Sequence, residues 1–391
     1  MLKRALSLSD SLVALRRQVH RHPELGFREE QTAALAARRL AELGIAVRTG
    51  VGKTGVIGDL GEGGRCIALR ADMDALPMQE ANEVPYASAI PGVMHACGHD
   101  AHVACLLGAA QLLSEESAAG RLPGRVRFLF QPSEEAQDAE GMSGGMRMAA
   151  EGAMEGADAA VALHVWADDP LGTISLRDGT MTAHPDKFEL VIEGKEAHGA
   201  MPQRGHDAIV LAAQVIQALQ AVVSRRTDPT HAKVLTIGTI QGGTKDNILA
   251  GRVAMTGTLR TFDEPTRQVL LDEMEKACSV ARALGGDYSL KVIPGYLPVE
   301  NDPGLSALVR QVGTELLGAG NVTEAPLEMG GEDFSYFAQS VPGCLFWLGA
   351  AFPGEAKRLH HHPLFDIDER CLPLGTALLA EVSLRYLAGA A

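Results

Sequence analysis

The chain has 391 residues, of which 46% are hydrophobic and 21% charged, and its formal net charge is −14. This length favours two domains, and the acidic balance, with no basic run, argues against nucleic acid as a partner. No apolar run approaches the roughly 18 residues of a membrane span. The N-terminus lacks the apolar segment of a secretory signal, and the six cysteines form no CxxC pair. We therefore expect a cytoplasmic protein with reduced thiols and no membrane partner.

In chain order, the pattern first predicts two helices, over residues 9–20 and 29–43, the second of them ended by Gly44. Short apolar runs then alternate with helices. Strands are expected at 54–60, 66–70, 126–131 and 159–165, and helices after Asp100 and from Ser143. Such alternation is typical of an α/β fold with a mostly parallel central sheet.

The order of expected strands and helices changes near Phe188. Strands expected at 188–193, 234–241, 253–262 and 288–293, with helices at 207–224 and 264–284, give the β-α-β-β-α-β order of a ferredoxin-like sandwich. The first pattern then returns, with helices at 303–317 and after Glu332, a strand at 343–349 and a helix from Leu372. The sequence therefore predicts a discontinuous first domain, residues 1–183 and 296–391, interrupted by an inserted α+β domain, residues 184–295.

The densest group of metal-binding side chains lies at residues 95–102, which read HACGHDAH. Cys97 and His99 are two residues apart just before an expected helix, so both can face one ion, and Gly98 permits the close backbone path. The alternative is a helix start that is polar by chance, and five donor residues within eight positions make it the less favoured interpretation. We expect His95 and His102 to be structural or to support the ligands.

Two carboxylates, Asp72 and Asp74, follow the apolar run that ends near residue 70. Open α/β sheets place their ligands at the carboxyl ends of strands, so either carboxylate could bind a metal. Each could equally hold the second nitrogen of a ligand imidazole and fix its tautomer. For Asp74 we expect this second, supporting role.

A further apolar strand, at 126–131, ends close to Glu134 and Glu135. A pair of adjacent glutamates is usually a solvated acidic loop, but its position at the end of a buried strand favours a site. Neighbouring glutamates can have different roles, one binding metal while the other acts as general base on a water molecule.

Imidazoles occur in two more segments, at His164 in the apolar run 159–165 and in a run of three histidines at 360–362 before Pro363. A lone strand histidine is often a core residue, and a histidine run can be a surface accident. Five donor-bearing segments together nevertheless favour a metal site. The motifs GxxxxGK[ST] and HExxH are absent from the sequence, which argues against the chemistries that they carry.

Together these segments resemble the M20 metallopeptidase superfamily. Within it they resemble the amidohydrolase branch of hippurate hydrolases, bacterial N-acyl-amino-acid amidohydrolases and plant auxin-conjugate hydrolases. The stretches that carry the resemblance run from one end of the chain to the other: LRADMDALPM (69–78), PGVMHACGHDAH (91–102), QPSEE (131–135), ALHV (162–165), AHGAMP (197–202), MGGEDFSYF (329–337) and LHHHPLFDIDE (359–369).

The resemblance implies a catalytic first domain that binds two divalent metal ions, with Glu134 as the general acid and base. His361 is preferred over its two histidine neighbours because the branch has a histidine, one residue and then proline. The implied metal ligands are Cys97, His99, Glu135, His164 and His361.

The inserted domain resembles the family's lid and dimerisation domain, so the resemblance also implies a homodimer. His198 matches a histidine that reaches the active site of the partner subunit, and Asn247 and Arg260 match positions that bind the polar end of the substrate. Residues 247–250 read NILA where relatives usually have NVIP, so no proline fixes the backbone after Asn247.

The activity implied by the resemblance is metal-dependent hydrolysis of the amide bond of N-acyl amino acids, with hippurate as the first candidate. It would release a carboxylic acid and a free amino acid. Because a thiolate ligand favours softer ions, we expect Mn, Zn, Co or Ni rather than Mg or Ca. Two alternatives are a metallo-exopeptidase acting on dipeptides and a catalytically silent binding or sensor protein of the same fold.

Overall fold

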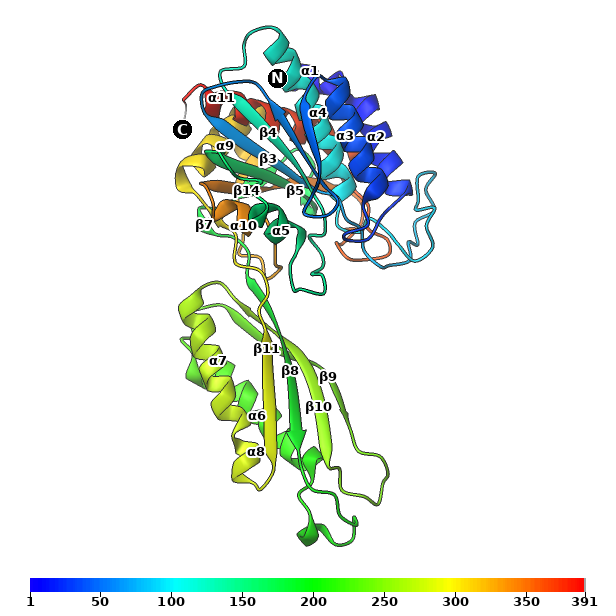
Figure 1. The fold of residues 1–391 in the computed structure, drawn as a ribbon, viewed down its shortest axis with the longest axis vertical. Coiled ribbons are helices and arrows are strands. Elements are labelled where there is room, and N and C mark those ends of the chain that lie inside the picture. The colour runs from blue at the N-terminus through cyan, green and yellow to red at the C-terminus, as the bar shows by residue number, and fades with distance from the viewer. Residues whose placement is uncertain (390–391) are drawn as a thin grey trace. The chain divides into compact units, whose positions relative to one another are not determined.

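The computed structural model describes residues 1–389 and divides them into two compact units (Figure 1). The first unit contains Met1–Met181, Val299–Pro326 and the chain from Asp333 onward. The second contains Thr182–Pro298 together with a short return segment, Leu327–Glu332. The sequence placed the inserted domain at 184–295, whereas the compact unit also includes this return segment, which pairs with it through a bridge between Thr182 and Glu328.

An eight-stranded sheet forms the centre of the first unit. Its middle strands β4, β3, β5 and β14 run parallel, as do β6 and β13, while β1–β2, β2–β4 and β14–β6 are antiparallel pairs. The expected α/β fold with a mostly parallel sheet is therefore confirmed. In sheet order the strands are β1 (Ala46–Val51), β2 (Gly55–Leu60), β4 (Arg125–Gln131), β3 (Cys66–Asp72), β5 (Ala159–Pro170), β14 (Gly343–Ala351), β6 (Ile174–Leu176) and β13 (Val322–Glu324); β7 (Gly179–Thr180) pairs separately with β12 (Glu300–Asn301).

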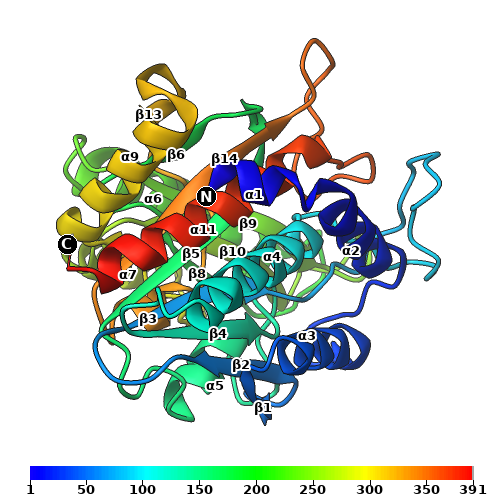
Figure 2. The ribbon, with the colours of Figure 1, turned by 90° about the horizontal axis from the view of Figure 1, so that it is seen from above.

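Both faces of this sheet are buried, because successive side chains of a strand point to opposite faces. On β4, Phe128 and Phe130 enter the larger apolar core, whereas Leu129 enters a smaller core on the other face. Figure 2 shows α4 and α11 on one side of the sheet and α5 on the other. The larger core is covered by α1 (Leu2–Leu6), α2 (Ser9–Arg21), α3 (Glu30–Glu42), α4 (His99–Ala118), α9 (Pro303–Leu317) and α11 (Leu372–Leu387), and the smaller core by α5 (Gly144–Ala150) and α10 (Ser335–Ala338).

The second unit is a four-stranded antiparallel sheet with helices, in the strand order β11-β8-β10-β9. With two helical segments between the strands, this is the expected ferredoxin-like arrangement. Alternate side chains of β8, namely Phe188, Leu190 and Ile192, face the helices and form its core. The elements are β8 (His184–Glu193), η1 (Pro202–Arg204), α6 (Ala208–Ala221), η2 (Val222–Arg226), β9 (Lys233–Gly242), β10 (Arg252–Thr261), α7 (Glu264–Cys278), α8 (Val280–Ala283) and β11 (Asp287–Ile293).

Several elements differ from the sequence expectation. The helix expected at 264–284 is interrupted at Ser279, and the helix expected after Glu332 is only the short α10. The peripheral α1, β1, β6 and β13, and the 3₁₀ turns η3 (Ala319–Asn321) and η4 (Glu369–Cys371), were not predicted. The strand β1 is mostly exposed, so it lacks the apolar pattern that reveals a buried strand.

Within the described chain, one helical stretch, Ala208–Arg226, is long and apolar enough to cross a membrane by length and composition alone. Core helices of globular domains meet the same criterion. Here Leu211, Val215 and Leu219 are buried in the apolar core of the second unit.

Candidate metal centre

The candidate site lies where several strands of the large sheet end. The strand β3 ends at Asp72 and is followed by Asp74, and β4 ends at Gln131, three residues before Glu134. The helix α4 begins at His99, and its preceding residue Gly98 has the left-handed φ of 93° that lets the chain turn directly into the helix. Parallel topology therefore brings side chains from distant parts of the sequence to one edge, as in other open α/β sheets.

Three overlapping groups of metal-binding atoms lie at this edge, the ligand atoms of each group being within 4.8 Å of one another. The five expected ligands and Glu134 each belong to at least one of them, and Cys97, His99 and Glu135 are each shared by two. The groups are Cys97, His99 and His164; Cys97, Glu135 and His361; and His99, Glu134 and Glu135. Two groups sharing a thiol have the composition of a site for two neighbouring ions.

The buried imidazoles have their tautomers fixed by backbone carbonyls. His99 donates from Nδ1 to the carbonyl oxygen of Asp74 at 2.9 Å, and His164 donates from Nδ1 to the carbonyl oxygen of Val165 at 2.7 Å. In each ring Nε2 then carries the lone pair that a metal needs. The Nε2 of His164 lies 3.4 Å from the sulfur of Cys97, so these two donors already face the same point.

His361 approaches from a loop late in the chain. Its Nε2 is 2.9 Å from Oε1 of Glu135, and its backbone amide donates to the carbonyl of Ala96 at 2.8 Å. This backbone has a φ of 56°, which is uncommon for a residue other than glycine. The side chain of His361 is 51% exposed, so it forms the open side of the group while His99 forms the buried side.

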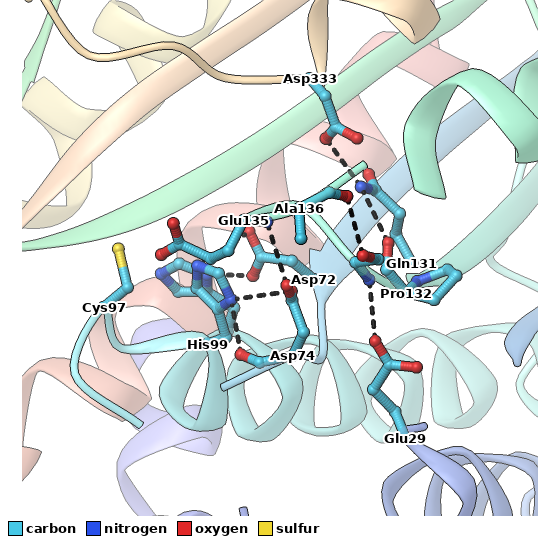
Figure 3. Close-up of polar contacts among 12 residues, drawn as sticks. Glu29, Asp72, Asp74, Cys97, His99, Gln131, Pro132, Glu135, Ala136 and Asp333 are labelled. Carbon is cyan, nitrogen blue, oxygen red and sulfur yellow. Dashed lines mark hydrogen bonds and ion pairs between the residues drawn. The ribbon is translucent and has the colours of Figure 1, made fainter. Parts of the chain in front are cut away.

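Asp74 links two of the candidate ligands (Figure 3). One carboxylate oxygen is 3.2 Å from Nδ1 of His99, and the other accepts the backbone N–H of Glu135 at 3.0 Å. Asp74 therefore contacts the ring of one candidate ligand and the backbone of another, and it can fix the distance between them.

Two further histidines, His102 and His360, lie beside the candidate ligands; the sequence predicted a structural or supporting role for His102. His102 donates to Asp72 at 2.5 Å and accepts the N–H of Val165 at 2.9 Å, so both of its ring nitrogens are occupied and neither is free for metal. Asp72 is in turn paired with Arg70 at 2.7 Å, and this ion pair fixes the carboxylate that holds the ring of His102. Burial alone would raise the pKa of Asp72, but the Arg70 guanidinium and the adjoining imidazoles hold this pKa well below its usual range.

His360 is oriented in a similar way. The N–H of Ala167 donates to its Nε2 at 3.1 Å, which leaves the proton on Nδ1, 3.8 Å from the sulfur of Cys97. His360 thus lies beside the thiol as a donor. The sequence favoured His361 over His360 as a ligand and predicted no other role for His360.

The charges around the site favour a bound cation. Burial, followed by the charges of Glu135 and Glu134, raises the pKa of the Cys97 thiol well above its usual value. Burial would lower the pKa of His99, but the neighbouring Asp72 and Asp74 raise it to about 10. These carboxylates therefore retain protons on the site in the absence of another cation, and a divalent metal binds by replacing such protons.

The donor set also fits a divalent metal chemically. Nε2 of His99 is buried and, among residues 1–389, has no hydrogen-bond partner, the nearest carboxylate oxygen being that of Asp72 at 3.6 Å. Such an atom is costly unless something pairs with it. Thiol, imidazole and carboxylate donors of this kind suit Zn and its first-row neighbours better than Mg or Ca.

The remaining expected site residues lie in the second unit. His198 pairs with Ile248 through a backbone bridge, and the N–H of Gly199 donates to the carbonyl of Asn247 at 2.8 Å, which brings His198 and Asn247 onto neighbouring segments. The N–H of Ala200 donates to Nδ1 of His198 at 3.0 Å, which leaves the proton on its Nε2. Arg260 lies on β10, where partial burial lowers the pKa of its guanidinium.

Comparisons with known proteins identify the family to which the chain belongs. Residues 68–385 match the Peptidase family M20/M25/M40. The chain is 38% identical to N-acetyl-L-cysteine deacetylase of Bacillus subtilis, over 97% of this chain and 89% of that protein. It is 40% identical to IAA-amino acid hydrolase ILR1-like 2 of Arabidopsis thaliana, over 97% of this chain and 85% of that protein.

A solved structure shows the same fold. The crystal structure of the Bacillus subtilis YXEP protein, described as a dinuclear metal binding peptidase from the M20 family, is 34% identical to this chain with a TM-score of 0.83. The match covers 98% of this chain and 99% of that one. The family match covers most of the sequence, the relatives match along nearly its whole length, and the fold is shared. The chain therefore belongs to the M20 peptidase family, in its amidohydrolase branch.

Proposed function

We propose that this protein hydrolyses the amide bond of N-acyl amino acids with two divalent metal ions bound by Cys97, His99, Glu135, His164 and His361. The observation that carries the proposal is the position of Glu134, a buried carboxylate whose ligand atom lies within 4.8 Å of those of His99 and Glu135. A carboxylate beside metal ligands is placed to move a proton during hydrolysis. The names of two relatives, an N-acetyl-L-cysteine deacetylase and an IAA-amino acid hydrolase, point to the same substrate class.

In this mechanism Glu134 accepts a proton from the attacking water and returns it to the nitrogen of the leaving amine. The bound ions would supply Lewis acidity to the carbonyl group and lower the pKa of water near them. Asp74 holds His99 and the backbone of Glu135 while the charge of the site changes. His198, with its proton on Nε2, is suited to donate a hydrogen bond to the oxyanion that develops on the carbonyl oxygen.

Arg260 and Asn247 are proposed to bind the carboxylate of the amino-acid half. Within the described chain, the Arg260 guanidinium makes no hydrogen bond or ion pair and feels Asp186 only through its charge, which is unusual for a partly buried arginine. Arginine is well matched to a carboxylate because its planar fork can donate two parallel hydrogen bonds.

We also propose a homodimer formed through the second unit. The strand β9 is an edge of its sheet, and Ile240 on this strand is 56% exposed. Ile209 and Val210 at the start of α6 are exposed as well. An exposed edge strand with apolar side chains is a surface that folded proteins usually cover, and a second copy would cover it symmetrically. With six free cysteines, we propose that the dimer works in a reducing compartment, the cytoplasm.

The substrate class is tested with a panel. The protein is stripped of metal, reloaded separately with Mn, Zn, Co or Ni, and assayed with hippurate, N-acetyl-cysteine and an indole-acetyl amino acid, each beside an unblocked dipeptide. We expect turnover of N-acyl amino acids and little of dipeptides, with hippurate as the first candidate. Faster turnover of dipeptides would favour the exopeptidase alternative, and metal binding without turnover of any compound would favour a silent binding protein.

The proton-transfer role is tested by Glu134→Gln. This variant keeps the size of the side chain and removes the base, so kcat should fall by about 10²–10⁴-fold. Metal content, measured by atomic emission, should stay at the wild-type level because Glu134 is not proposed as a ligand. Activity close to wild type would contradict the assignment.

A further inference from the structure

The loop that carries Glu134 and Glu135 begins with a strained residue. Ser133 has a φ of 41°, in the left-handed region that is unfavourable for a residue with a β-carbon. Such a conformation persists only where the surroundings hold it. What holds Ser133 therefore also sets the direction in which the chain enters Glu134.

Every polar group of Ser133 is bonded. Its N–H donates to Oε1 of Glu29 at 2.8 Å, its carbonyl accepts the N–H of Gly144 at 2.9 Å, and its hydroxyl donates to the carbonyl of Ala136 at 2.9 Å. Of these partners, only Glu29 comes from a distant part of the sequence, and only Glu29 holds the amide on the side away from Glu134. Figure 3 shows Glu29 reaching this loop from the side opposite His99.

Glu29 is itself rigidly placed and completely buried, with 0% exposure. The same Oε1 accepts the N–H of Phe27 at 2.9 Å, and Oε2 accepts the hydroxyl of Thr54. At Gly26, an added β-carbon would overlap the Ser133 hydroxyl, so the segment before Glu29 lies directly against the loop. A buried carboxylate with this many fixed donors does not change rotamer easily.

The position of Glu29 does not have the usual structural explanation. It occupies the N-cap of α3, yet its side chain makes no capping hydrogen bond. Glu24 performs that task instead, since its carboxylate accepts the N–H groups of Gln31 and Thr32 at 2.9–3.1 Å. The carboxylate of Glu29 is therefore directed away from its own helix and toward Ser133.

We propose that Glu29 is a positioning residue: by holding the amide of Ser133 it keeps the left-handed backbone from which Glu134 and Glu135 are aimed at the metal centre. Asp74 holds the same loop from the other end through the N–H of Glu135. The two glutamates are thus fixed between two carboxylates from different parts of the chain. The catalytic half of this proposal rests on the proposed function of Glu134, and the metal-binding half does not.

The first test compares Glu29→Ala with Glu24→Ala. Both remove a carboxylate that accepts backbone N–H groups near α3, so both should lower the melting temperature. Only Glu29→Ala should misplace the glutamate pair. We expect its kcat to fall by about 10²-fold with little change in KM, the scale expected for a displacement of about 1 Å. Glu24→Ala should keep kcat within about threefold of wild type, which is ordinary for a change remote from the reacting groups.

A second measurement does not depend on any substrate. Zn²⁺ affinity, measured in competition with a chromophoric chelator, should weaken by about 10–100-fold in Glu29→Ala, as for other residues that orient metal ligands. This effect is expected even if the natural substrate is not an N-acyl amino acid. If the protein does not hydrolyse N-acyl amino acids, the Zn²⁺ affinity of Glu29→Ala still tests whether Glu29 positions the glutamate pair. If Glu29→Ala does not fold, Glu29→Gln keeps one oxygen acceptor for Ser133 and should show a smaller loss.

The decisive experiment restores the left-handed backbone conformation at position 133 without restoring the carboxylate of Glu29. In the Glu29→Ala background, Ser133→Gly should recover about tenfold in kcat and in Zn²⁺ affinity, since glycine adopts a positive φ without penalty. Ser133→Ala removes the same hydroxyl but keeps the β-carbon, and it should recover neither. Equal effects of the two replacements, or wild-type kcat and Zn²⁺ affinity in Glu29→Ala, would overturn the proposal.

Discussion

At the scale of single residues, the site depends on which atom of each side chain is left available. The Nδ1 atoms of His99 and His164 are both used by backbone carbonyls, so their Nε2 atoms remain for a metal. His102 has a similar ring and lies close by, but both of its nitrogens are already paired. Whether a histidine can bind metal thus depends on hydrogen bonds to residues outside its own sequence segment.

Cys97 is the residue most expected to determine the choice of metal. Replacing its sulfur with a carboxylate in Cys97→Asp removes the one soft ligand, so the site should shift from Zn toward Mn. The stripped protein is incubated with equal concentrations of the two ions, and the bound metals are measured by atomic emission. We expect the Zn:Mn ratio to fall by roughly tenfold or more. A ratio equal to that of wild type would show that Cys97 does not set the preference.

At the scale of elements, the helix α4 positions the site through its first turn. Gly98 precedes it with a φ of 93°, and a β-carbon there would overlap the side chain of Val165. The close approach of α4 to β5 thus requires glycine for two reasons, conformation and space. This contact brings Cys97 and His99 next to His164.

Gly98→Ala should therefore destabilise the protein more than a similar change at the other end of the same helix. Gly120 also has a positive φ, of 69°, but nothing lies within 4 Å of the position of an added β-carbon. Gly120→Ala measures the backbone penalty alone, about 1–2 kcal/mol. The difference between the two variants in thermal unfolding isolates the clash with Val165, and Gly98→Ala should also bind less metal. Equal melting temperatures would contradict this account of the α4–β5 contact.

At the scale of the whole molecule, we propose that the active site is complete only in a dimer. Glu134 and the candidate ligands belong to the first unit, while His198 belongs to the second. If His198 acts on the site of the partner subunit, the two functions can be removed in different chains and restored by mixing them. Apolar exposure at Ile240 on the β9 edge indicates the surface through which copies would associate.

The mixing experiment uses His198→Ala and Glu134→Gln. Each variant alone should lose about 10²-fold or more in kcat. Chains unfolded together and refolded at a 1:1 ratio should form half heterodimers with one intact site each, giving roughly a quarter of wild-type activity. The control adds Ile240→Lys to both chains, which should block association and abolish rescue. Absence of rescue between the unmodified variants would exclude a role for His198 in trans.

The local sequence predicted most of the elements near the site. The bounds of α9 and the start of α11 match those expected, since Pro303 and Leu372 begin long apolar-periodic helices. The short peripheral strands β6 and β13 were missed because three residues carry no readable period. The candidate ligands could be named individually because cysteine, histidine and paired glutamates at strand ends are chemically distinctive.

The sequence by itself determined the fold class, the family and the residue types that could bind metal, since these depend on periodicity and on motifs read locally. Tertiary structure alone decided which nitrogen of each histidine is available, that His102 is occupied by Asp72, and that Glu29 reaches Ser133 across 104 positions of sequence. Hydrogen bonds between distant segments are set by how strands and helices pack, and burial makes each such partner obligatory. No local pattern encodes them.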